Sequence, residues 1–328
     1  MPLPTPAPTE SAYRKEFERQ QGRLRQALDS RSDPRLDQLL AEVTQALERM
    51  QGGRYGVCES CHESIEPQTL AANPLIGFCL DHLSAPERRR LQDDLELAAR
   101  VQARLLPERE LRLAGWEVSY SYQPMGLVGG DYCDLVRTAS NDFFFFLGDV
   151  SGKGVAASLL AAQLHGLFRT LVALELPLEM MIERANRIFC EATLSGQFAT
   201  LVCGRASPSG RVEWVNAGHP TPLLVEGGRA RQLESSSHPL GLFCDGAFPM
   251  NRLELSPRQA LLLYTDGLVE ATNSRGDEYG VARAAKLAET PCSSADALVN
   301  ACLEDVAQFR SNSPLTDDLT VMALRRTS

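Results

Sequence analysis

Apolar residues in the first third of the chain recur at the spacing of an α-helix. Residues 1–9 hold four prolines and are expected to form a disordered arm. Two apolar stripes follow, and Asp33-Pro34 between them is a typical helix start. The stripes are formed by Tyr13, Phe17, Leu24 and Leu28, and then by Leu36, Leu39, Leu40, Val43, Leu47 and Met50. Because the connection is short, the pattern predicts an antiparallel helical hairpin over residues 10–53, ending at Gly52-Gly53.

A third helical stripe follows the hairpin and ends at Pro107. Its positions alternate steps of four and three residues, which is the period of a coiled coil, although such a stripe can equally lie on a neighbouring domain. The positions are Leu91, Leu95, Ala98, Gln102 and Leu105. We therefore expect a linker helix within residues 84–107.

From Leu111 onwards the pattern changes to alternation, which is typical of half-buried strands. Two long stretches with continuous apolar faces, residues 155–173 and 178–194, interrupt the strands and are predicted to be helices. The predicted strands are 116–122, 143–147, 199–205, 212–216, 261–264 and 319–324, and a last helix is predicted at 294–309. This order of elements indicates an α+β fold, with helices outside a largely antiparallel sheet.

Composition limits the class of protein. A chain of 328 residues is too long for one ordinary domain, and 44% hydrophobic with 23% charged residues is a globular composition. The formal net charge of −9 argues against a nucleic-acid partner, because phosphate contacts need a basic face. The longest apolar run, residues 143–147, is far below the roughly 20 residues of a membrane span, and the Pro-rich start does not resemble a signal peptide. We therefore expect a cytoplasmic protein without a membrane segment.

Nine cysteines, an odd number, argue against a secreted disulfide scaffold and favour a reducing compartment. Cys58 and Cys61 are separated by two residues, and after seventeen intervening residues Cys79 and His82 repeat that spacing. This is the pattern of a structural zinc site, which can hold together a segment too small for its own core. His62 could also supply a nitrogen ligand, but His82 completes the second pair with Cys79 and is favoured as the fourth ligand. The other six cysteines are expected to be reduced thiols.

Aspartate-bearing turns lie at predicted strand ends in the second half of the chain. Their carboxylates belong to Asp131, Asp149, Asp266, Asp317 and Asp318. Neighbouring glycines let the backbone approach closely, so that a sheet can bring several oxygen ligands to one place. Gathered carboxylates repel one another unless a divalent cation binds, and oxygen ligands favour Mg²⁺ or Mn²⁺. Taken singly, each turn could be an ordinary Asp-Gly turn, and Asp149 could simply cap the following helix.

The turns, in this order, closely resemble the PPM family of metal-dependent serine/threonine phosphatases, in particular its bacterial SpoIIE/RsbU-like branch. The similarity covers roughly residues 108–328, and residues 96–107 resemble the helix that leads into this catalytic domain. The resembling segments are Gly129–Tyr132, Gly148–Gly154, Phe198–Leu201, Asn216–Pro220, Pro239–Leu242, Tyr264–Ala271 and Asp317–Val321. The resemblance implies a PPM phosphatase-type β-sandwich flanked by helices.

The same resemblance implies two Mn²⁺ or Mg²⁺ ions that activate a water for attack on phosphorus. The implied catalytic and metal-binding residues are Asp131, Asp149, Val150 through its carbonyl, Asp266 and Asp317. Asp149 would contact both ions, and Asp318 could take the place of Asp317. The implied substrate is a phosphoserine or phosphothreonine protein, such as a STAS-domain anti-sigma-factor antagonist in partner-switching regulation. The N-terminal segments would then regulate the enzyme, and a homodimer is expected.

The N-terminal part, residues 10–83, resembles the DksA/TraR zinc-finger family. The residues that carry this likeness are Gly53–Cys61, Ile65–Pro67, Leu70, Asn73-Pro74 and Cys79–His82. Some members act on RNA polymerase through acidic residues at the hairpin tip, where this chain has Asp29 and Asp33. A DksA-like regulator that binds RNA polymerase, with a secondary phosphatase domain, is therefore the alternative function. The expected organisation is an arm at 1–9, a helical hairpin at 10–53, a zinc finger at 54–83, a linker helix at 84–107 and a phosphatase domain at 108–328.

Four further residues could take part in chemistry but also have structural explanations. Cys133 is not expected to be a nucleophile, because the Cys-x5-Arg loop of cysteine phosphatases is missing. Lys153 could contact a substrate phosphate, but a role in holding its turn is favoured. His219 could be a general acid, but its position between two strands favours a turn-stabilising role. His165 lies on an apolar helix face and is expected to be a core or interface residue.

Overall fold

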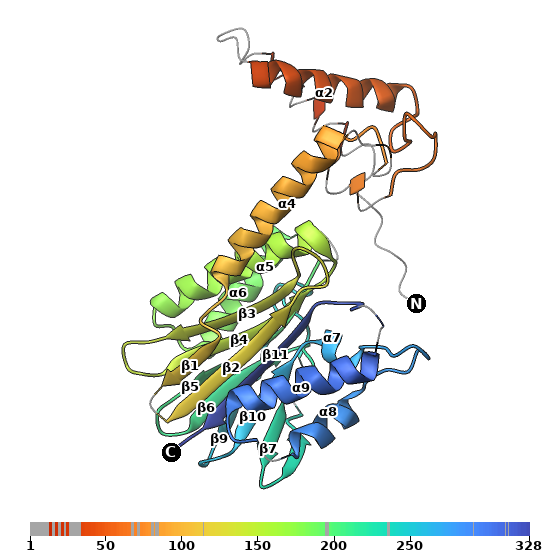
Figure 1. The fold of residues 1–328 in the computed structure, drawn as a ribbon. Coiled ribbons are helices and arrows are strands. Elements are labelled where there is room, and N and C mark those ends of the chain that lie inside the picture. The colour runs from red at the N-terminus through yellow and green to blue at the C-terminus, as the bar shows by residue number, and fades with distance from the viewer. Residues whose placement is uncertain are drawn as a thin grey trace. The chain divides into compact units, whose positions relative to one another are not determined.

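Figure 1 shows the computed structural model of the chain. The residues that it describes are 13–14, 17–18, 21–22, 24–25, 34–66, 69–70, 73–79, 82, 85–113, 115–193, 197–234, 237–290, 292–311, 313 and 315–328. The chain divides into two compact units, residues 1–94 and 95–328. The division falls within the helix α4 (Ala85–Leu105), at the place where the sequence predicts a linker helix.

The first unit contains the predicted second helix of the hairpin as α2 (Pro34–Gln51), which ends directly before Gly52-Gly53. Its apolar face packs against Phe17 and Leu24, which lie in helical residues of the first stripe. The buried side chains of α2 in this core are Val43, Ala46, Leu47 and Met50. The predicted packing of the two stripes on each other is therefore present, whereas the hairpin tip at 26–33, with Asp29 and Asp33, lies outside the described residues.

A second, smaller core in this unit belongs to the cysteine-rich segment. Its buried members are Cys58, Ile65 and Ile76. Arg49 of α2 ties this segment to the helix: its Nη1 donates to Glu59 Oε1 at 2.9 Å and its Nη2 donates to the Leu75 carbonyl at 2.6 Å. Three fully buried residues among those described are few, so the segment depends on contacts other than apolar packing.

The second unit is built around two sheets in which every strand pair is antiparallel. The six-stranded sheet has the order β1 (Glu110–Leu113), β2 (Trp116–Gln123), β11 (Leu319–Arg326), β10 (Ala260–Tyr264), β7 (Leu223–Glu226), β8 (Arg229–Gln232). The five-stranded sheet has the order β3 (Asp131–Arg137), β4 (Phe143–Val150), β5 (Ala199–Ala206), β6 (Arg211–Ala217), β9 (Asn251–Glu254). The expected antiparallel arrangement is confirmed, and the two sheets form the β-sandwich that the family resemblance implies.

Helices cover the outer faces of this sandwich, as the sequence predicts (Figure 1). The helices α5 (Gly154–Ala173) and α6 (Leu178–Ala192) pack on the five-stranded sheet. The helices α8 (Val281–Ala288) and α9 (Ala295–Arg310) pack on the six-stranded sheet. One core therefore lies between the sheets, and one lies under each helical layer.

The continuous apolar run of β4 follows from its position in the middle of this arrangement. Phe143, Phe145 and Leu147 belong to the core between the two sheets. Phe144 and Phe146 point the other way, into the core under α5 and α6. Both faces of β4 are thus buried, and a strand with two buried faces needs apolar residues at every position.

Among the described helices, α5 is the one that is long and apolar enough to cross a membrane by length and composition, with a mean hydropathy of 1.4. Its buried apolar side chains face the five-stranded sheet. Those in the core are Ala157, Ala161, Leu164, Phe168, Leu171 and Val172. The hydropathy of α5 is therefore that of a core helix.

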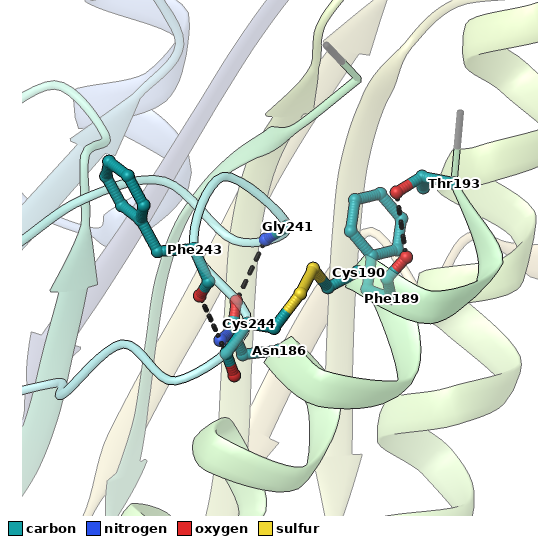
Figure 2. The surroundings of a disulfide bond; sticks show 7 residues. All are labelled: Asn186, Phe189, Cys190, Thr193, Gly241, Phe243 and Cys244. Carbon is teal, nitrogen blue, oxygen red and sulfur yellow. Dashed lines mark hydrogen bonds between the residues drawn. A yellow bond between two sulfur atoms is a disulfide. The ribbon is translucent and has the colours of Figure 1, made fainter. Parts of the chain in front are cut away.

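One cysteine prediction is wrong. Cys190 near the end of α6 and Cys244 in the loop between β8 and β9 form a disulfide, with Cα atoms 5.6 Å apart (Figure 2). Asn186, one turn earlier on α6, accepts a hydrogen bond from Gly241 N–H and donates to the Phe243 and Cys244 carbonyls. The packing of this loop on α6 brings together two cysteines 54 residues apart, a proximity that their spacing does not indicate.

Candidate active site and a Cys–His cluster

The predicted acidic residues meet at one end of the two sheets. Asp131 is the first residue of β3 and lies directly opposite Asp149 of β4 in the strand register. Asp266 begins the one-turn helix α7 (Asp266–Val269) immediately after β10, and Asp317 lies just before β11. Because β10 and β11 are paired, the acids that follow one and precede the other are brought to the same edge.

Asp131 joins the two sheets at this edge. Its Oδ2 accepts hydrogen bonds from Thr265 Oγ1 at 3.0 Å and from Thr320 Oγ1 at 2.5 Å. Thr265 follows β10 and Thr320 lies in β11, so both donors belong to the side of the six-stranded sheet. Its Oδ1 is buried and has no hydrogen-bond partner. Burial and then the charge of Asp149 raise the pKa of Asp131 well above its usual range. A buried carboxylate oxygen without a donor fits a cation ligand.

The other carboxylates perturb one another in the same way. Burial first, and then the charges of Asp266, Asp317 and Asp318, raise the pKa of Asp149 to about 8, while Lys153 lowers it. Burial and then Asp317 also raise the pKa of Asp266. These mutual effects place the acids in one electrostatic cluster, and a bound cation would relieve their repulsion.

Asp317 and Asp318 have different surroundings. Asp318 is buried, and its two carboxylate oxygens accept hydrogen bonds from Met125 N–H at 2.7 Å and Gly130 N–H at 2.6 Å. The side chain of Asp317 is 40% exposed, and its Oδ2 lies 2.9 Å from Lys153 Nζ. Asp318 therefore holds the loop before β3, whereas Asp317 faces the open part of the cluster.

Lys153 connects two loops of the site. Its Nζ contacts Asp317 and also donates to the Thr316 carbonyl at 2.7 Å. This contact agrees with the predicted role in holding a turn, and it places a positive charge beside the acids. Thr265 and Thr320 are not among the predicted site residues, although both lie in segments that carry the family resemblance.

Gly130 leaves space in front of the acids. A Cβ atom at this position would lie 3.1 Å from the Val150 carbonyl oxygen, 3.0 Å from the Ala157 Cβ and 3.5 Å from Asp149 Oδ1. The glycine thus keeps a carbonyl and a carboxylate oxygen accessible side by side. This cradle fits the predicted participation of Val150 and Asp149 in holding a cation.

His219 is buried within the turn in which the sequence places it. Asn216 closes the turn, because its Oδ1 accepts from His219 N–H at 2.7 Å and its Nδ2 donates to the His219 carbonyl at 2.9 Å. The ring Nδ1 lies 2.9 Å from Thr200 Oγ1. Burial lowers the pKa of His219 to about 3, so the imidazole is neutral at physiological pH. Cys133 and His165 are likewise buried.

The neutral His219 predicts a pH dependence of stability. The pKa of His219 in the folded state lies below the usual value of about 6.5, because the folded protein favours the neutral imidazole. The contribution of this residue to the free energy of unfolding is therefore fully present above pH 6.5 and is lost as the pH falls towards 3. In His219→Gln, the free energy of unfolding should fall less steeply with pH between 6.5 and 4, by up to about 1.4 kcal/mol per pH unit. Denaturant titrations at several pH values measure the slope. His238→Gln is the control, and equal slopes in wild type and His219→Gln would contradict the assignment.

The four predicted zinc ligands also come together. The ligand atoms of Cys58, Cys61, Cys79 and His82 all lie within 4.8 Å of one another, and no other group of three or more metal-ligand residues in the described part of the chain is as tight. Cys61 Sγ lies 3.9 Å from Cys79 Sγ, and Cys79 Sγ lies 3.1 Å from His82 Nδ1. A tetrahedral zinc with thiolate ligands separates them by roughly 3.8 Å, so the cluster has the right size. His62 is not a member of the group.

Backbone groups around this cluster favour thiolate. Burial raises the pKa of Cys58, but hydrogen bonds from the N–H groups of Cys61, Cys79 and Ser60 outweigh it and lower the pKa to about 6. Thiolate is the form that binds zinc.

Solved structures share the fold of the second unit. They include the RsbU and RsbW domains of Rv1364c from Mycobacterium tuberculosis, at 27% identity and a TM-score of 0.59, covering 68% of this chain and 62% of that one. They also include the SiaA-PP2C domain of Pseudomonas aeruginosa, at 17% identity and a TM-score of 0.64, covering 74% and 99%. The sandwich with acids at one edge thus has a PP2C-like fold.

The family is defined by sequence as well. The family described as Stage II sporulation protein E (SpoIIE) matches residues 139–327, and the chain belongs to this family. The matched range contains Asp149, Asp266 and Asp317 and begins after Asp131. A curated relative, phosphoserine phosphatase RsbP of Bacillus subtilis, is 28% identical over 187 residues, which are 55% of this chain and 46% of the relative. The chain therefore spans less than half the length of that relative.

Proposed function

We propose that this chain is a metal-dependent protein phosphatase that hydrolyses a phosphoserine or phosphothreonine protein. The observation that carries the proposal is the convergence of Asp131, Asp149, Asp266 and Asp317 at one edge of the sandwich, with one buried carboxylate oxygen left without a donor. The name of the relative RsbP supports phosphoserine as the substrate group.

The proposed ligands follow from the geometry of the edge. Asp149 and the Val150 carbonyl lie beside the cradle at Gly130, Asp131 offers its free Oδ1, and Asp266 and Asp317 face them from the six-stranded sheet. Two Mn²⁺ or Mg²⁺ ions bound here would supply an activated water and neutralise charge on the phosphate oxygens. Asp317 is preferred over Asp318 as a ligand, because backbone N–H groups already occupy both oxygens of Asp318.

The Cys58, Cys61, Cys79 and His82 cluster is proposed to bind one structural zinc ion, because the four ligand atoms are grouped at a suitable separation. The N-terminal unit would then be a folded regulatory module, in a homodimer in the cytoplasm. The alternative function on RNA polymerase depends on the hairpin tip, which lies outside the described residues, and it stays a prediction.

The substrate is proposed to be a phosphorylated STAS-domain anti-sigma-factor antagonist, which would place the chain in partner-switching regulation. The purified chain with Mn²⁺ is expected to release phosphate from such a protein and from phosphoserine peptides, and EDTA should abolish the release. A phosphotyrosine peptide of the same sequence is the matched control and should react poorly. If Mn²⁺ binds but no phosphoserine or phosphothreonine protein is hydrolysed, the proposal fails.

A further inference from the structure

The side chain of Gln102 forms a two-point contact with the loop that precedes β3. Its Nε2 donates to the Gly129 carbonyl at 2.7 Å, and its Oε1 accepts from Gly129 N–H at 3.1 Å. A side-chain amide thus pairs with both polar groups of one backbone residue. Gln102 lies in the last turn of α4, and both partners belong to the second unit.

Gly129 is closely surrounded by other groups. A Cβ atom there would lie 2.6 Å from Asp318 Oδ2 and 2.6 Å from the Tyr122 hydroxyl oxygen. The next residue, Gly130, donates its N–H to Asp318 Oδ2. The backbone before β3 is therefore held from one side by Asp318 and from the other by Gln102.

This loop leads directly into the acidic cluster. Asp131 follows Gly129 by two residues, and the Gly130 carbonyl accepts a hydrogen bond from Val150 N–H at 3.3 Å. A shift of Gly129 would therefore move both Asp131 and the cradle beside Val150. Within a ligand set, displacements well below 1 Å are enough to weaken a metal site.

We propose that Gln102 is a positioning residue that holds Asp131 for metal binding, through its paired hydrogen bonds to Gly129. The inference rests on the proposed function, since it concerns the affinity of the same site. Gln102 touches none of the proposed ligands itself. Its effect should therefore fall on metal affinity and leave the turnover at saturating metal largely unchanged.

Two variants separate pairing from packing. Gln102→Ala removes both hydrogen bonds, and Gln102→Glu keeps the shape but sets a carboxylate oxygen against the Gly129 carbonyl. Both should weaken Mn²⁺ binding, measured by the electron paramagnetic resonance signal of free Mn²⁺, by roughly 10- to 100-fold. If Gln102 acted only through packing, Gln102→Glu would bind Mn²⁺ as wild type does. Arg104→Ala on the same helix is the control and should bind Mn²⁺ as wild type does.

A readout without metal makes the two proposals distinguishable. In metal-free protein, amide hydrogen exchange at Gly129 should become roughly five- to tenfold faster in Gln102→Ala, as expected for the loss of one hydrogen bond. Gln102→Glu keeps an acceptor for the Gly129 N–H, so this measurement uses the alanine variant. Unchanged exchange at residues 129–131 in Gln102→Ala, or Mn²⁺ affinity within twofold of wild type in both variants, overturns the role of Gln102. If wild type itself neither binds Mn²⁺ nor hydrolyses phosphoproteins, the proposed function fails, and the exchange measurement alone then decides the role of Gln102.

Discussion

Asp149→Asn is expected to lower kcat for phosphoprotein hydrolysis by on the order of 10³-fold or more, at saturating Mn²⁺. The amide has the same shape as the carboxylate and keeps its position opposite Asp131 in the strand register. It carries no charge, however, and cannot serve as the anionic ligand that is proposed at this position. Steady-state kinetics on a phosphoserine protein measure the effect. The surface variant Asp277→Asn is the control, and retention of more than a tenth of the activity in Asp149→Asn would contradict the assignment.

The same substitution should have the opposite effect on the stability of the metal-free protein. Burial and the neighbouring acids raise the pKa of Asp149 to about 8 in the folded state, above its unfolded value of about 4. The folded state therefore favours the protonated acid, and stability that is present below pH 4 is lost as the pH rises through 8. Asp149→Asn should raise the Tm of EDTA-treated protein at pH 8.5 and change it little at pH 4. A variant that loses both activity and stability at pH 8.5 would point to general misfolding.

Removal of zinc is expected to unfold the cysteine-rich segment of the first unit. Among the described residues of this segment, the fully buried part of its apolar core is small, and structural zinc sites contribute about 10–16 kcal/mol of binding free energy to folding. Cys61→Ser should lower the zinc content, measured by plasma mass spectrometry, from about one ion per chain to near zero. Limited proteolysis should then cut within residues 54–82 first.

The control for this prediction is Cys292→Ser, which alters a partly buried thiol outside the cluster. It should keep the zinc ion and the resistance of residues 54–82 to proteolysis. Wild-type protein purified in the presence of zinc that holds none of the metal would contradict the zinc assignment. A zinc-free Cys61→Ser variant with an unchanged cleavage pattern would show instead that the metal does not stabilise this segment.

The local patterns of the sequence determined much of this protein. The helical stripe of α2, the long helices α5 and α6, and the alternating strands are periodic features, and a period is set by neighbouring residues alone. The same holds for Cys58-x2-Cys61 and Cys79-x2-His82, and for acids placed where a strand ends. A strand end and its following turn are encoded within a few residues, so the chemistry that they carry can be read directly.

Only the tertiary structure decided the features that join distant residues. It paired Cys190 with Cys244, assigned Asp318 to the backbone of the loop before β3, and brought Thr265 and Thr320 to Asp131. Each of these outcomes depends on contacts between segments tens to nearly two hundred residues apart, which no local period encodes. Packing determines which groups are buried and hydrogen-bonded at such contacts. Two residues that look equivalent in the sequence, such as Asp317 and Asp318, can therefore have different contacts in the folded protein.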